Sequence, residues 1–95
     1  MDMKQMMAQA QKMQRVLEEK LKEFDQKVFE FDYKNGSIVV QMSGDSMIQK
    51  ITINKTLIDP EDAITLEEMI AEAINQATLS IKEDREAIQD SVTNK

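Results

Sequence analysis

The side chains that could do acid–base or metal chemistry in this chain are carboxylates, lysines and Tyr33, because the 95 residues include neither cysteine nor histidine. Thiol nucleophiles, disulfides, imidazole bases and Cys- or His-ligated metals are therefore excluded. Three acidic residues at 59–62 could hold a divalent cation through oxygen ligands, but their spacing around Pro60 is more typical of a helix start. The acidic residues at 67–72 have no neighbouring nucleophile and indicate a solvated face. We expect no catalytic residue, no metal site and no cofactor.

Basic residues on one side of the first predicted helix offer a different chemistry, the binding of phosphate. At about 100° per residue, Lys4, Lys12 and Arg15 share a face that is well separated from the apolar stripe. Gln11 lies among these cations and adds no negative charge. Lysine and arginine contacts, with a glutamine as a further hydrogen-bonding group, suit a nucleic-acid backbone. The alternative is an ordinary solvated face with i,i+4 ion pairs such as Arg15–Glu19.

The formal net charge of −6 is distributed unevenly along the chain. Residues 1–27 carry six basic and five acidic side chains, whereas residues 60–95 carry three basic and nine acidic ones. The overall field opposes the approach of phosphate, but the excess acid lies almost entirely in the last third of the chain. Any contact with DNA is therefore expected at the distal part of the first helix, and we expect it to be weak and sensitive to salt.

Apolar side chains recur every three or four residues over 3–24, which predicts a helix with one apolar stripe. This candidate packing stripe consists of Met3, Met6, Met7, Ala10, Met13, Leu17, Leu21 and Phe24. A promiscuous methionine groove is the alternative interpretation, but packing is favoured because the methionines share their face with leucine and phenylalanine. A helix of roughly 30 Å cannot cover its stripe with a small sheet alone. It needs a partner helix from later in the chain or from a second copy.

Residues 27–58 predict three strands with short connections, and therefore an antiparallel meander. Asn35-Gly36 is a signal for a tight hairpin, and residues 43–46 predict a second turn in which Gly44 is free to take a positive φ. A three-stranded sheet leaves its edges open, which invites pairing with another chain.

Residues 59–92 return to a helical pattern, with Pro60 expected at the first helical position and Thr65 with Glu68 as a capping box. Its candidate packing residues are Ile70, Ala73, Ile74 and Ala77, of which the two alanines would allow close approach to the sheet. The predicted fold is a single α+β domain over 1–95 with the order α-β-β-β-α. No apolar run is long enough to cross a membrane, and the cytoplasm is the expected compartment.

Three segments in this order resemble one protein family. Residues 3–14 (MKQMMAQAQKMQ) resemble the opening helix of the YbaB/EbfC nucleoid-associated proteins. Residues 51–58 (ITINKTLI) are similar to the third strand of that family and the exit from it, and residues 66–77 (LEEMIAEAINQA) are similar to its C-terminal helix. This sequence departs from the family in three places. The glycine-rich approach to the second strand is reduced, the Gly/Met-rich C-terminal tail is replaced by other residues, and the C-terminal helix is strongly acidic.

The resemblance implies a bacterial, cytoplasmic homodimer shaped like tweezers that binds double-stranded DNA and associates with the nucleoid. The sheets and C-terminal helices would form the body, and the N-terminal helices would project as arms. By position, the resemblance carries DNA contact to Lys4, Gln11, Lys12 and Arg15, and also to Lys82 and Arg85 of the C-terminal helix. The alternative function is a dimeric adaptor on the same fold, with a protein partner and little or no affinity for DNA.

Overall fold

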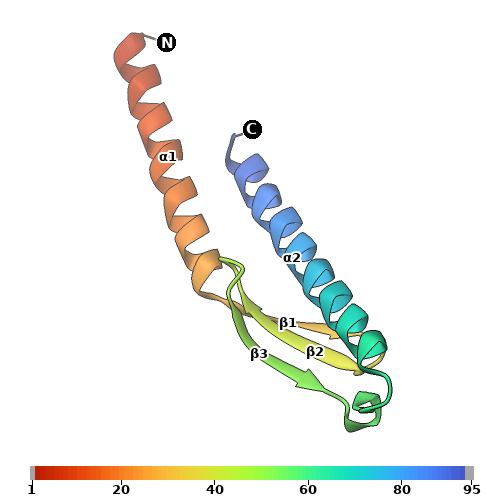
Figure 1. The fold of residues 1–95 in the computed structure, drawn as a ribbon. Helices are drawn as coiled ribbons and strands as arrows, with labels where there is room; N and C mark the ends of the chain where they lie inside the picture. The colour runs from red at the N-terminus through yellow and green to blue at the C-terminus, as the bar shows by residue number, and fades with distance from the viewer. Residues whose placement is uncertain (1, 94–95) are drawn as a thin grey trace.

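The computed structural model describes residues 2–93, with the backbone alone at Thr93, and has the predicted α-β-β-β-α order. The elements are α1 (Met3–Gln26), β1 (Val28–Tyr33), β2 (Ile38–Ser43), β3 (Ile48–Ile53), the short 3-10 helix η1 (Lys55–Leu57) and α2 (Ala63–Thr93). The two helices rise on the same side of the sheet, and α1 projects beyond the C-terminal end of α2 (Figure 1). The molecule is therefore elongated, with extents of 70 × 18 × 17 Å.

The three strands form an antiparallel meander in the order β1-β2-β3, as predicted. The register places Tyr33, Ile38 and Ile53 side by side across the three strands. Residues two apart share a face of a strand, so Phe29 and Phe31 of β1 and Val40 and Met42 of β2 line the same face, whereas Val28 and Val39 lie on the other. A bulge between Gln41 and Met42 shifts the register of β3 and sets Ile48 opposite Met42. One face of the sheet is consequently apolar, and the other is mostly polar.

The two turns of the sheet differ from the expected use of glycine. The first turn is a four-residue connection in which Lys34, Asn35 and Gly36 all have positive φ, at 48°, 53° and 82°. In the second turn the residue with positive φ is Ser46, at 65°, and Gly44 does not use its freedom to take one. Gly44 is required for a different reason: a Cβ there would lie 2.0 Å from the carbonyl oxygen of Phe24. The absence of a side chain lets the last turn of α1 rest on this turn.

The start of α2 also differs from the expected capping pattern. The helix begins at Ala63, so Pro60 lies in the preceding turn and not at the first helical position. Asp62 supplies the cap, because its carboxylate accepts from the backbone N–H of Thr65 at 3.3 Å and from the Thr65 hydroxyl at 2.7 Å. The predicted capping box, with Thr65 as the N-cap and Glu68 reaching back to it, was therefore wrong. The N-cap is Asp62, about one helical turn earlier.

The core lies between α2 and the apolar face of the sheet. Ala73 and Ala77 of α2 are fully buried against β2 and β1, which confirms the close approach expected of the two alanines. Ile38 and Val40 of β2 are likewise inaccessible to solvent. A helix is about 10 Å wide, so one helix covers about two strands, and the β3 side of the apolar face stays open.

Candidate nucleic-acid interface

The distal part of α1 is a free-standing helical arm. Its first turn is capped by Asp2, whose carboxylate accepts a hydrogen bond of 2.8 Å from the backbone N–H of Gln5. Every residue from Asp2 to Lys12 is exposed to solvent. Between Met3 and Leu17 the sequence contains no acidic residue, and the first acid after the cap is Glu18. This arm is therefore uncovered and locally cationic.

The base of the arm is held firmly by the body. Phe24 is buried and packs against Phe29 of β1, with the two rings tilted to each other and their centroids 5.0 Å apart. The backbone N–H of Gly44 donates to the carbonyl of Lys27 at 2.9 Å, directly after the end of α1. The direction in which the arm leaves the sheet is set by these contacts.

An ion pair joins the base of α1 to α2. The Arg85 guanidinium donates through Nε to Asp25 Oδ1 at 3.2 Å and through Nη2 to Oδ2 at 3.5 Å. Both side chains are about one-third exposed, so the pair contributes little stability. Arg85, a candidate for DNA contact, is thus occupied within its own chain.

A groove of about 430 Å³ separates the middle of α1 from the end of α2. Met13, Val16 and Val92 form its apolar part, and Lys12 and Lys20 stand at its rim. Lys12 therefore lies on the side of α1 that faces the groove.

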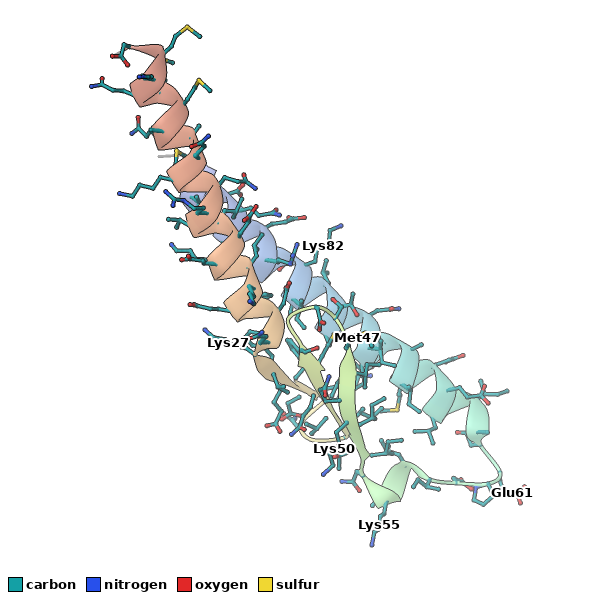
Figure 2. The ribbon with its side chains drawn as sticks, turned by 90° about the vertical axis from the view of Figure 1, so that its left-hand side faces the viewer. Lys27, Met47, Lys50, Lys55, Glu61 and Lys82 are labelled. Atoms are coloured by element: carbon teal, nitrogen blue, oxygen red, sulfur yellow. The ribbon has the colours of Figure 1, made fainter. Side chains whose placement is uncertain are left out.

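Lys4, Gln11 and Arg15 are exposed on the arm, on the side turned away from α2. Lys82 is exposed on α2, far along the molecule from the free end of the arm (Figure 2). The structure therefore brings the four candidates of α1 together on one arm. It keeps the two candidates of α2 apart from them.

The candidate packing residues fall into two groups. Phe24, Ala73 and Ala77 are buried in the core, and Met13, Leu17, Leu21, Ile70 and Ile74 are half-buried. By contrast, Met3, Met6, Met7 and Ala10 are exposed in the single chain, because α2 ends level with the middle of α1. Packing of these four remains a prediction that requires a second copy.

The whole sequence matches one family of known proteins. The YbaB/EbfC DNA-binding family matches residues 1–95, which is the entire sequence. The chain belongs to the YbaB/EbfC DNA-binding family. This confirms the resemblance found from the opening helix, the third strand and the C-terminal helix.

Curated members of the YbaB/EbfC family are similar over nearly their full length. A nucleoid-associated protein of Malacoplasma penetrans is 51% identical over 88 residues, which is 93% of each chain. A nucleoid-associated protein of Ureaplasma parvum is 40% identical over 95 residues, covering 100% of this chain and 95% of the relative. The crystal structure of an uncharacterized Helicobacter pylori protein has the same fold, with a TM-score of 0.74, 15% identity and 96% of both chains covered.

The part of the chain that the structure describes has neither a cluster of metal ligands nor a membrane-spanning helix. Among residues 2–93, no three acidic side chains are gathered closely enough to hold a metal ion. No helix in the described part of the chain is long and apolar enough to cross a membrane.

Several contacts that position the arm were missed from the sequence. Asp25 and Arg85 lie 60 positions apart, and no local pattern links them. The contact of Gly44 with Phe24 depends on the tertiary approach of two elements, so composition could indicate a turn there but not its neighbour. The hydrogen bond from the Tyr33 hydroxyl to the Glu72 carboxylate likewise joins β1 to α2.

Proposed function

We propose that this chain forms a homodimer that binds double-stranded DNA, weakly and in a salt-sensitive manner, through the basic faces of its projecting α1 helices. It acts as a nucleoid-associated protein without catalysis. One observation carries the proposal: the arm from Met3 to Leu17 holds three cations and no acid, and every residue from Met3 to Lys12 is exposed to solvent. Membership of the YbaB/EbfC DNA-binding family supports the choice of DNA as the anion.

The charge of the whole chain makes the proposed binding weak. The −6 net charge doubles in a dimer, and its long-range field opposes DNA. Screening limits that opposition, because the Debye length is about 8 Å at physiological salt and the molecule is 70 Å long. The arm can therefore attract phosphate locally while the acidic helix α2 prevents strong binding.

The open side of the sheet supports the proposed dimer. Along β3, Ile48 is 44% exposed and Met47, just before it, is 59% exposed. The side chains of Ile51 and Ile74, on β3 and α2, are half-buried at the rim of the core. We place the dimer contact on this seam between β3 and α2, because a second copy would bury its apolar side chains and pair the free edge of β3.

The direct test compares charge removal on the arm with the same charge removal elsewhere. The variant carrying Lys12→Ala and Arg15→Ala should bind a DNA duplex about tenfold more weakly, or worse, because two phosphate contacts are lost on each arm. Lys27 follows the body end of α1 and Lys55 lies in η1, so both are away from the free end of the arm and from the proposed dimer seam, and Lys27→Ala with Lys55→Ala is the matched control (Figure 2). An electrophoretic shift titration measures both. Equal affinity of the two variants would contradict the proposal.

The adaptor is the second candidate function, and the acidic excess of residues 60–95 favours it. An adaptor would show no DNA shift even at low salt and high concentration, while the dimer stayed intact. A stable protein partner recovered from nuclease-treated lysate would then support it, and a clear shift at low salt would contradict it.

A further inference from the structure

The outward side of the α1 arm carries a mixed set of side chains that charge alone does not explain. At about 100° per residue, Lys4, Met7, Gln11 and Arg15 fall within an arc of about 80°. All four are exposed, and the structure gives none of them a packing role in the single chain. We call these four residues the outward face.

Met7 is the unexpected member of the outward face. Its neighbour Met6 has almost the same exposure, 56% against 59% for Met7, but points about 100° away. Met6 is in line with Leu17 and Phe24, the side of α1 that packs on the body. A second copy that covered this side of α1 would therefore bury Met6, whereas Met7, although it is one of the predicted packing residues, would stay in water.

The outward face matches the chemistry of the DNA major groove. A helix with its side chains is about 10–12 Å wide, and the major groove is about 12 Å wide. Lysine and arginine contact phosphates or guanine, glutamine pairs with the N6 and N7 atoms of adenine, and apolar side chains pack on the thymine methyl group. Met7 and Gln11 are one helical turn apart, so both could face neighbouring base pairs.

We infer that the end of α1 enters the major groove of A·T-containing DNA, with Met7 against a thymine methyl and Gln11 toward adenine. Lys4 and Arg15 flank these two residues and hold the neighbouring phosphates. Charge complementarity favours DNA as the occupant, since no acidic residue lies between Met3 and Leu17. A second copy docked on the same face would bring like charges together. The inference rests on the proposed DNA binding and adds the groove and the base contact.

The test uses two duplexes that differ solely in uracil replacing thymine, which deletes the methyl group from the major groove. Wild-type protein should prefer the thymine duplex by about three- to fourfold for each methyl contacted. Met7→Ala should bind both duplexes equally, with the affinity that wild type has for the uracil duplex. Met6→Ala is the matched control and should keep the preference, because Met6 points to the other side of the helix. Fluorescence anisotropy at one fixed salt concentration measures all six affinities.

The other outcomes separate this inference from the proposed function. Equal wild-type affinity for the two duplexes would overturn the inference and leave DNA binding intact. Loss of the preference in Met6→Ala but not in Met7→Ala would also overturn it. If Met7→Ala instead changed the oligomeric mass without changing DNA affinity, a second copy and not DNA would be the occupant. Absence of binding to either duplex at low salt would defeat the proposed function itself.

Discussion

Tyr33 shows how one polar contact helps fix the body that carries the arms. Its ring is buried beneath α2, and its hydroxyl donates to the carboxylate of Glu72. The ammonium of Lys34 lies 5.4 Å from the ring centroid. The hydrogen bond to Glu72, followed by burial, raises the pKa of Tyr33 above its usual value. Folding therefore favours the neutral, protonated form of the Tyr33 phenol.

Removing the hydroxyl should weaken the fold modestly. Tyr33→Phe keeps the buried ring and deletes the hydrogen bond, so the free energy of unfolding should fall by about 1 kcal/mol. Urea denaturation at neutral pH measures the loss. A variant as stable as the wild type would show that water replaces the bond without cost.

The same residue predicts a pH dependence at alkaline pH. Because its pKa is raised on folding, Tyr33 keeps its proton in the folded chain at pH values where the unfolded chain has lost it. The stability that it contributes is complete below about pH 10 and is lost as the pH rises through the folded pKa. The difference in unfolding free energy between wild type and Tyr33→Phe should therefore shrink above pH 10. A constant difference up to pH 11 would contradict this assignment.

At the scale of elements, the joint between α1 and the second turn of the sheet decides where the arm points. The Gly44 backbone passes so close to Phe24 that even a methyl group must displace the main chain. The ion pair of Arg85 with Asp25 bridges the same joint from the α2 side.

Gly44→Ala should therefore destabilise the protein by about 3 kcal/mol, at the upper end of the cost of overpacking. Gly36→Ala is the matched control, because a Cβ there meets nothing within 4 Å and the cost is the positive φ alone, about 1 kcal/mol. Thermal unfolding compares the two. A smaller loss for Gly44→Ala than for Gly36→Ala would show that the joint is looser than described.

Much of this architecture follows from local sequence signals, whereas the joint between α1 and the second turn of the sheet does not follow from them. The apolar period of α1, the alternation of the strands and the paired alanines of α2 each act within one element or between neighbours, so the order of elements was predictable. The roles of Gly44 and Asp62 were not, because a turn glycine can serve either a positive φ or a close approach. Several acidic residues before α2 could also have capped it.

The candidate site was predictable to a similar extent. The basic side of α1 could be placed by angle, since a helix fixes the relative directions of its side chains. The engagement of Arg85 with Asp25 could not, because it depends on how α2 lies against α1. The exposure of Met3, Met6 and Met7 in the single chain depends on where α2 ends, which the apolar pattern does not state.

For the whole molecule, the open seam beside β3 predicts self-association. Light scattering at micromolar concentration should give twice the chain mass of 10.9 kDa. Ile48→Lys places a charge on the exposed apolar seam and should shift the protein toward the monomer. Ile64→Lys is a control at an exposed isoleucine on the first turn of α2. A wild-type monomer, or equal masses for the two variants, would contradict the proposed contact.

The central claim is that the cations of the arms hold DNA phosphates, and the salt dependence of binding tests it most directly. The logarithm of the association constant should fall linearly with the logarithm of salt concentration. Lys12→Ala with Arg15→Ala should make that slope shallower by about two for each arm on the duplex, whereas Lys27→Ala with Lys55→Ala should leave it unchanged. Equal slopes for wild type and the arm variant, or no binding at the lowest salt, would contradict the account.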